Sequence, residues 1–248
     1  MGQAMSWTLG SGPRITNRGQ SCPLSERALE IVDGMLLGDG SLSHPNILST
    51  YLSLSSSKGP SFPLWLGEEL AKEGIQGRMG FKKRNGVLKS TGHPRIGSWK
   101  YISLRYKEWS DQRNRWYPEG IKIVPQDVRI TPLSTLIWYL GDGTLKRAIK
   151  GEHTTFYIFL CTNGFTKEDC DHLCNRLCEK SIIGPSLRGV CKPRAKLDSR
   201  GHPKIYLGPP LVSKFLRYMT PLPIQMSCAF GYKWRSLDYA RKGSDITP

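Results

Sequence analysis

The chain has 248 residues, of which 38% are apolar and 23% are charged, and this balance is typical of a soluble globular protein and excludes an intrinsically disordered one. Its 36 Lys and Arg residues outnumber its 20 Asp and Glu residues, giving a net charge of +16. Nucleic acid or an anionic surface is therefore the expected partner, and a protein that is merely basic is the alternative. Apolar runs all fall short of the ~20 residues of a membrane-spanning helix, so no membrane partner is expected.

The first half of the chain begins with a predicted helix at 26–38, ERALEIVDGMLLG, whose apolar residues recur at helical spacing. Ser25 is its expected N-cap, and Gly38 its expected end. The pattern then predicts, in order, a strand at 48–57, a helix at 62–74, a hairpin at 77–90 with Asn85 and Gly86 at its tip, a strand at 97–106 and a helix at about 107–117.

The second half follows a proline-containing connection at 117–132 and repeats this order. Its first helix, TPLSTLIWYLG, has Thr131 as the expected N-cap and Pro132 in the first turn, and is expected to stop at Gly141. The remaining predictions are strands near 144–149 and 154–161, a helix at 166–180, strands near 186–192 and 203–207, and a helix at 209–219.

Seven cysteines are scattered along the chain, and their odd number favours a reducing compartment. Cys170, Cys174 and Cys178 recur every four residues and so share one stripe of the helix predicted at 166–180. We predict that this stripe packs in a core, because zinc sites favour CxxC pairs with a histidine partner. A zinc site is the alternative.

A short phrase occurs twice, as LLGDGSLS at 36–43 and as YLGDGTLK at 139–146. A tight Asp-Gly hairpin turn is one interpretation, but the matching helical pattern before each copy favours two equivalent helix ends. If the helices pack side by side through Gly34, Gly38 and Gly141, then Asp39 and Asp142 project from the same end. Two such carboxylates repel each other and require a cation, for which Mg²⁺ is suited.

The phrases VDGMLLGDG at 32–40 and TLIWYLGDG at 135–143 resemble two copies of the LAGLIDADG motif of homing endonucleases, in the single-chain form with two motifs. The resemblance covers the order of elements from about 23 to 234. It implies an α+β fold of two pseudo-symmetric αββαββα halves, with the two motif helices at the interface and DNA-binding β-sheets. The corresponding domains are an N-terminal extension at 1–22, a first half at 23–120, a linker at 121–131 and a second half at 132–248.

The resemblance also implies site residues. Asp39 and Asp142 would bind Mg²⁺ or Mn²⁺, and backbone carbonyls of Gly38 and Gly141 would add ligands. Similar enzymes have a lysine near the end of each half, beside the active site, and the best matches here are Lys122 and Lys233. The expected catalytic residues are then Asp39, Asp142, Lys122 and Lys233. There are two departures from the motif: the sixth position holds Leu37 and Leu140 instead of an acid, and the third holds Gly34 in one copy but Ile137 in the other.

Basic and polar side chains occur where sheets lying in the major groove would need them, and base pairs there show distinct donor and acceptor patterns. The predicted DNA-binding residues are Tyr51, Ser53, Ser55, Arg78, Lys82, Arg84, Lys89, Lys100, Arg105, Lys146, Arg147, Lys150, Arg188, Lys192, Arg194 and Lys204. The halves differ in side chains, so the expected target is a long and imperfectly palindromic duplex.

We therefore expect a site-specific homing endonuclease that makes a metal-dependent double-strand cut in DNA. One alternative is an intron-encoded RNA maturase or another non-cleaving nucleic-acid-binding protein of the same fold, with its own intron RNA as a partner. Another is a metal-independent repeat protein in which GDG only ends helices. A monomer is expected because both halves are present. The resemblance implies an intron-encoded protein in a mitochondrion or chloroplast, or otherwise in the cytoplasm of a microbe.

Overall fold

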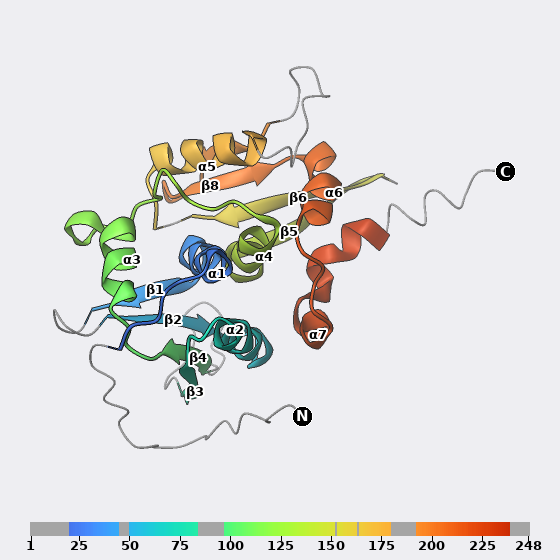
Figure 1. Cartoon of the computed structure of the whole chain (residues 1–248). Helices are drawn as coiled ribbons and strands as arrows, with labels where there is room; N and C mark the ends of the chain where they lie inside the picture. The colour runs from blue at the N-terminus through green and yellow to red at the C-terminus, as the bar shows by residue number, and fades with distance from the viewer. Residues whose placement is uncertain are drawn as a thin grey trace. The chain divides into compact units, whose positions relative to one another are not determined.

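A computed structural model describes residues 20–44, 50–83, 97–151, 153–162, 164–179 and 192–238. They form two compact units. Unit 1 contains the chain up to Ile31 together with Asp39–Arg115, and unit 2 contains Val32–Gly38 and the chain from Trp116 onward. Each unit has its own four-stranded antiparallel sheet (Figure 1). The predicted boundaries of the extension, halves and linker stay predictions.

The predicted order of elements is confirmed, because αββαββα occurs twice along the chain. The first copy is α1 (Glu26–Leu37), β1 (Gly40–Ser43), β2 (Tyr51–Ser56), α2 (Ser61–Lys72), β3 (Gly77–Lys82), β4 (Ser98–Ser103) and α3 (Glu108–Trp116). The second is α4 (Pro132–Asp142), β5 (Gly143–Lys150), β6 (His153–Cys161), α5 (Lys167–Glu179), β7 (Arg194–Leu197), β8 (Pro203–Leu207) and α6 (Pro209–Tyr218). Short helical turns are η1 (Pro118–Gly120), η2 (Ile224–Met226), α7 (Ser227–Phe230) and η3 (Gly231–Trp234).

The sheet of unit 1 has the order β1-β2-β4-β3, and α2 lies against it (Figure 1). Leu52 and Leu54 of β2 and Tyr101 of β4 are buried, as are Trp65 and Leu66 of α2. Side chains alternate between the two faces of a strand, so these residues define the core face of the sheet. The residues between them point to the opposite face, here called the outer face.

The sheet of unit 2 has the equivalent order β5-β6-β8-β7, with α5 against β7 and β8 and α6 against β6. Ile158, Leu160 and Ile205 are fully buried on its core face. Cys170 and Cys174 of α5 are buried as well, which confirms core packing for these two members of the cysteine stripe, whereas Cys178 is half-buried. Among the described residues, no group of three or more His, Cys, Asp or Glu side chains is placed to hold a metal ion.

Both predicted N-caps are confirmed. The hydroxyl of Ser25 accepts a hydrogen bond from the backbone N–H of Ala28 at 3.0 Å. Thr131 and Ser134 form a reciprocal capping box at the start of α4, and Pro132 occupies its first turn. Each cap satisfies backbone donors that the first helical turn leaves without a partner.

The two motif helices end differently. As predicted, α1 stops before Gly38, but the prediction that α4 stops at Gly141 is wrong, because α4 continues through Asp142. Gly143 is extended and its N–H still donates to the carbonyl of Tyr139, so the helix passes directly into β5. Asp142 is therefore the last residue of α4, whereas Asp39 lies in a turn after α1.

The remaining differences concern strands. A strand lies at β7, after the range 186–192 predicted for it, and 186–191 lies outside the described residues. The tip predicted at Asn85 and Gly86 is also outside them. β3 pairs with β4, with Gly77 opposite Ser103 and Lys82 opposite Ser98. The second strand of the predicted hairpin, up to residue 90, lies outside the described residues.

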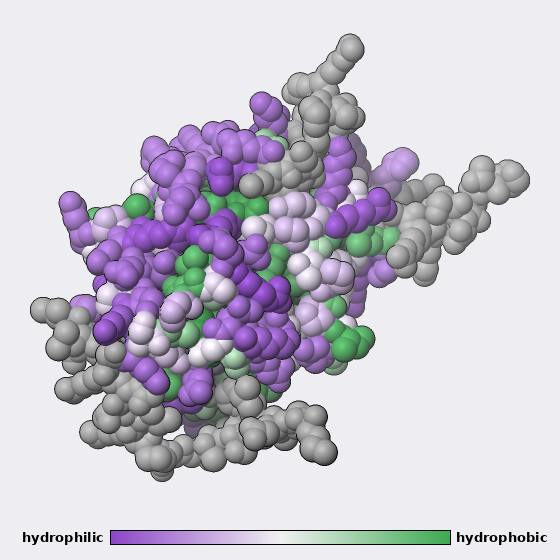
Figure 2. Space-filling model, viewed as in Figure 1, coloured by the Kyte–Doolittle hydropathy of each residue, from purple (hydrophilic) through white to green (hydrophobic). Residues whose placement is uncertain are grey.

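None of the described helices combines the length and apolar character needed to cross a membrane. Figure 2 shows hydrophilic residues over most of the described surface seen from this side, with hydrophobic residues in small patches between them.

Candidate functional site

The C-terminal half of α1 packs closely on α4 within unit 2, and glycine makes this possible. A Cβ atom added to Gly34 would lie 2.6 Å from the carbonyl oxygen of Ser134 and 2.9 Å from the Cβ of Ile137. One added to Gly38 would lie 3.8 Å from the Cα of Gly141. The close approach predicted at these glycines is confirmed. The difference at the third motif position also has a cause, since Ile137 fills space that a side chain at position 34 would need.

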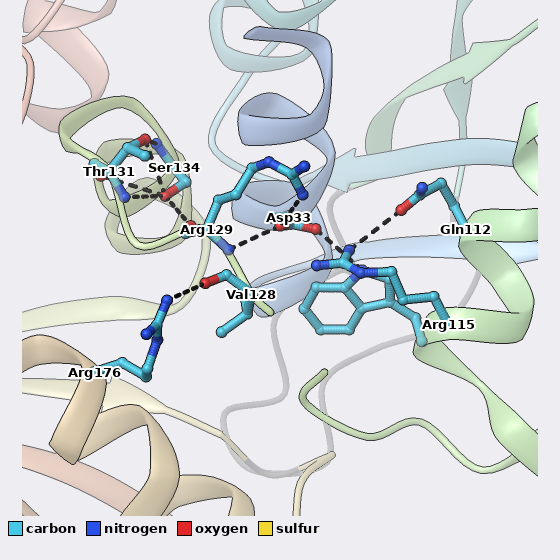
Figure 3. A network of polar contacts seen from close by, with 9 residues as sticks. Asp33, Gln112, Arg115, Val128, Arg129, Thr131, Ser134 and Arg176 are labelled. Carbon is cyan, nitrogen blue, oxygen red and sulfur yellow. Dashed lines mark hydrogen bonds and ion pairs between the residues drawn. The ribbon is translucent and has the colours of Figure 1, made fainter. Parts of the chain in front are cut away.

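A buried carboxylate fixes α1 against the segment before α4 (Figure 3). Asp33 is fully buried, and its Oδ1 accepts from the indole N–H of Trp116 at 3.2 Å. Its Oδ2 accepts from the backbone N–H of Arg129 at 2.9 Å and lies 3.5 Å from the guanidinium of the same residue. Sequence reasoning missed this residue, although an acid among apolar positions of a helix was the available signal.

The segment that Asp33 holds is fixed from other sides too. Arg176 of α5 donates from its guanidinium to the carbonyl of Val128 at 3.3 Å (Figure 3). Ser134 donates from its hydroxyl to the carbonyl of Arg129 at 2.5 Å. The chain entering α4 is thus held by both α1 and α5 within unit 2.

The C-terminal end of α4 carries a buried ammonium group. Lys233 is only 3% exposed, and its Nζ donates to the carbonyl oxygens of Tyr139 at 2.7 Å and Leu140 at 2.9 Å. The hydroxyl of Tyr139 donates in return to the carbonyl of Lys233 at 3.1 Å. The last carbonyls of a helix carry partial negative charge, so a cation here stabilises the helix end. Burial, with a smaller contribution from Tyr232, raises the pKa of Tyr139, so this phenol stays protonated and can donate.

Charged groups gather where α4 passes into the sheet of unit 2. Burial raises the pKa of the Cys161 thiol, the negative charge of Asp142 raises it further, and Lys204 and Lys233 act in the opposite direction. Cys161 lies directly opposite Lys204 in the β6–β8 pair. Asp142, Cys161, Lys204 and Lys233 therefore share one region at the start of this sheet.

The other predicted catalytic residues have different surroundings. Asp39 is exposed in the turn between α1 and β1. Lys122 is half-buried, and its ammonium lies 5.1 Å from the centre of the Phe165 ring, in the loop before α5. Lys122 and Lys233 are therefore not equivalent in environment. The metal-binding and catalytic roles assigned from the motif stay predictions.

The register of unit 1 places most of the predicted DNA-binding residues on its outer face. Ser55 pairs with Lys100, Arg78 with Ile102, and Lys82 with Ser98, so these side chains share one face. The set on this face is Tyr51, Ser53, Ser55, Arg78, Lys82 and Lys100. Ser53 is only 2% exposed and hydrogen-bonds with Ser41, so a contact to DNA would require its neighbours to move. Arg105 follows β4 and is half-buried, and Arg84 and Lys89 lie outside the described residues.

In unit 2, Lys146, Lys150, Arg194 and Lys204 lie on the outer face. Arg147 pairs with Phe156 and lies on the other face, with its guanidinium 3.5 Å from the hydroxyl of Thr154. Lys192 is exposed before β7, and Arg188 lies outside the described residues.

Sequence reasoning missed three aromatic residues on the outer face of unit 2, although their alternation with buried residues was the available signal. They are Tyr157, Phe159 and Tyr206.

This arrangement can be compared with known proteins. The sequence profile described as the LAGLIDADG DNA endonuclease family matches residues 29–188, which is more than half of the chain. The chain belongs to the LAGLIDADG DNA endonuclease family. The resemblance seen in the doubled motif is thereby confirmed.

One curated relative is similar in sequence. The chain is 27% identical over 154 residues to the uncharacterized protein MJ1098 of Methanocaldococcus jannaschii, and the match spans 62% of this chain and 56% of that protein. The chain thus spans little more than half the length of this curated relative.

A solved structure supports the fold. The homing endonuclease I-WcaI bound to its DNA recognition sequence is similar with a TM-score of 0.65 at 20% identity, over 89% of this chain and 95% of that one. I-DmoI in complex with DNA and Mn matches with a TM-score of 0.45 at 11% identity, over 78% of this chain and 97% of that one. The α+β LAGLIDADG fold, with its two αββαββα copies and two four-stranded sheets, is therefore established for this chain.

Proposed function

We propose that this protein is a site-specific homing endonuclease that makes a divalent-metal-dependent double-strand cut in a long, pseudo-palindromic DNA target. One observation carries the proposal. Each αββαββα copy has an aspartate at the C-terminal end of its motif helix, Asp39 two residues after α1 and Asp142 as the last residue of α4, and then a sheet whose outer face bears basic side chains. Each copy thus supplies one acid and one basic face. Two such copies are suited to cut the two strands of a DNA duplex.

The donor set fits Mg²⁺ or Mn²⁺. The proposed ligands are the carboxylates of Asp39 and Asp142 and the backbone carbonyls of Gly38 and Gly141, all of them hard oxygen donors. Mg²⁺ binds through one or two carboxylates when substrate phosphate and water complete its shell, so a cage made by the protein alone is not required. When bound, such an ion activates a water and offsets charge on the attacking and leaving oxygens.

The side chains of this protein then supply binding and position. Lys233 holds the last turn of α4, from which Asp142 extends. Lys122 and Lys233 are proposed to offset the charge that develops on the phosphate. Lysines and arginines of the outer faces bind phosphates and bases, and because the two faces differ, the two half-sites differ as well.

The biological setting is part of the proposal. Both motif copies are on one chain, so we propose that a monomer suffices to cut both strands. We propose double-stranded DNA as the partner, and an intron-encoded origin in a mitochondrion, a chloroplast or a microbial cytoplasm. Sedimentation of the purified protein as an obligate dimer would contradict the monomer.

The test is cleavage of a library of randomised DNA duplexes, followed by mapping of the cut in the selected sequence. We expect cutting with Mg²⁺ and none in excess EDTA. Asp39→Asn and Asp142→Asn should each abolish the double-strand cut, while Asp171→Asn, which changes a half-exposed carboxylate on α5, should cut normally. Unaltered cutting of both strands by either motif variant would overturn the assignment. Tight binding of the flanking intron RNA that assists splicing, without DNA cleavage, would instead indicate a maturase.

A further inference from the structure

The two sheets have the same frame but different chemistry on their outer faces. Gly40 pairs with Leu54 in unit 1, and Gly143 pairs with Leu160 in unit 2, which sets the equivalence of the strands. The pair Ser53 and Ile102 in unit 1 therefore corresponds to the pair Phe159 and Tyr206 in unit 2. At the next outer pair, Ser55 and Lys100 correspond to Cys161 and Lys204. Where unit 1 has serine hydroxyls, unit 2 has an aromatic ring and a thiol.

The aromatic residues of unit 2 form a cluster. The ring centres of Phe159 and Tyr206 are 5.4 Å apart, those of Tyr157 and Phe159 are 5.6 Å apart, and those of Tyr157 and Tyr206 are 5.9 Å apart. All three side chains are half-buried. They give the outer face of this sheet an apolar centre.

A cavity of about 360 Å³ adjoins this cluster. Phe159, Leu197 and Cys161 line it. Burial keeps the thiol of Cys161 protonated and therefore uncharged, as its raised pKa indicates. The cavity can thus accept an apolar group.

Lysines surround this cavity and indicate a polyanionic occupant. Lys146, Lys196 and Lys204 contribute to its lining. The ammonium of Lys204 is already paired with Asp198 at 3.0 Å, whereas Lys146 and Lys196 are exposed. Positive charge around an apolar centre complements a nucleic acid that presents an apolar group between its phosphates.

The ring geometry favours a base-paired duplex over an unpaired base. The ammonium of Lys196 lies 4.0 Å from the centre of the Tyr206 ring, and so it covers one face of that ring. The ring of Phe159 packs against Tyr157 edge to face and against Tyr206 at a tilt, so its contacts are with neighbouring rings of the same sheet. Stacking of an unpaired base requires a free ring face, whereas contact with a methyl group in the major groove does not. The apolar group that a duplex presents in its major groove is the 5-methyl group of thymine.

We propose that the sheet of unit 2 recognises thymine methyl groups in its half of the target, through Phe159, Tyr206 and the adjoining cavity. This inference rests on the proposed function and adds a specificity to it. Thr144 also lines the cavity and lies two residues after Asp142, so the recognised thymines lie next to the cleavage position. In unit 1 the position of Phe159 is held by Ser53, which is buried, so this cluster belongs to unit 2.

The test replaces each thymine of the selected duplex in turn by deoxyuridine, which pairs identically but lacks the methyl group. Dissociation constants for the wild-type protein are measured by fluorescence anisotropy in Ca²⁺. Each contacted methyl should contribute a factor of about four in affinity. We expect the sensitive positions to cluster in one half-site, beside the cut. Binding that is insensitive to every replacement, in a duplex that the protein does cut, would overturn this inference alone. Failure to bind or cut any duplex would overturn the proposed function and this inference with it.

A variant identifies the side chain responsible. At the sensitive positions, Phe159→Asn should bind the thymine duplex and the deoxyuridine duplex with equal dissociation constants. Ile149→Asn is the matched control, because Ile149 is an exposed apolar residue on the other face of the same sheet, and it should keep the difference. Discrimination that survives Phe159→Asn in a folded protein contradicts the proposal. So does tighter binding of single-stranded DNA than of the duplex, which would indicate stacking of unpaired bases.

Discussion

The ammonium nitrogen of Lys233 lies 2.9 Å from the carbonyl oxygen of Leu140, a residue 93 positions earlier in the chain. This contact joins the C-terminal segment of unit 2 to the last turn of α4. A buried charge is unfavourable unless it is paired or hydrogen-bonded, and here the carbonyls of Tyr139 and Leu140 provide the acceptors. The end of the motif helix and its cation therefore stabilise each other.

Lys233→Met should destabilise the protein by about 1–3 kcal/mol, because it removes two charge-assisted hydrogen bonds and leaves the carbonyl of Leu140 without this donor. Urea unfolding followed by circular dichroism measures the loss. Lys167→Met is the control, since Lys167 is exposed and its pair with Asp171 is at the surface, and stability should hardly change. Equal stability of the Lys233→Met variant and the wild type would refute the role of this contact.

Asp33→Asn should lower the free energy of unfolding by about 2–4 kcal/mol. An amide has only one oxygen that can accept a hydrogen bond, and its NH₂ group would then face the N–H of either Trp116 or Arg129. Arg129→Met is the informative comparison. It removes the ion pair at 3.5 Å but keeps the backbone N–H from which Asp33 accepts a hydrogen bond. Arg129→Met should therefore lose less stability than Asp33→Asn. A larger loss in Arg129→Met than in Asp33→Asn, from urea midpoints, would show that the ion pair dominates.

Gly34→Ala tests the close contact between α1 and α4. Alanine favours a helix over glycine by about 1 kcal/mol, so the change would stabilise an uncrowded helix. Here the new methyl group would lie 2.6 Å from the backbone oxygen of Ser134. The steric overlap should outweigh the gain in helix propensity, with a net loss of about 1–3 kcal/mol of stability. At Gly80 a new Cβ would meet nothing within 4 Å, so Gly80→Ala should cause no such loss. Thermal unfolding of the two variants decides the matter.

Glu69 should make stability depend on pH. Burial acts to raise the pKa of its carboxyl, but hydrogen bonds and charges from Lys72 and Arg27 outweigh this and hold the pKa below its ordinary value. A carboxyl with a lowered pKa in the folded state stabilises the protein fully above the ordinary value of 4.5, and this stabilisation is lost as the pH falls through the folded-state pKa.

Glu69→Gln should therefore be less stable than the wild type at pH 7, and the difference should shrink as the pH falls below 4. Urea midpoints at several pH values provide the measurement. Glu68→Gln changes the exposed neighbour on α2 and serves as the control, with little effect at any pH. A difference between Glu69→Gln and the wild type that stays constant from pH 7 to pH 3 would argue against the ion pairs.

Local patterns were enough to predict the motif helices, their N-caps and the buried cysteine stripe. Helical periodicity and cap chemistry act over a few residues, so Ser25, Thr131 and Cys174 could be assigned from their neighbours alone. The doubled GDG phrase then indicated the repeat, and the family resemblance implied the αββαββα order, although the pattern predicted no strand at β1.

Features that depend on distant partners could not be predicted in this way. Asp33 meets Arg129 across 96 residues, and Lys233 meets Leu140 across 93. The face of a strand residue depends on where pairing begins, and a shift of one residue reverses it. Arg147 shows this, because the pairing of β5 with β6 places it on the face opposite to Lys146.

The strict alternation of β6 has a consequence for how this chain can change over time. Ile158 and Leu160 are fixed by the core, whereas Phe159 between them points to the outer face. Exchange of Phe159 for another side chain would alter the proposed recognition while leaving the buried core of the unit intact. A lineage that loses its insertion site could thus drift toward a new one by steps that each preserve a folded protein.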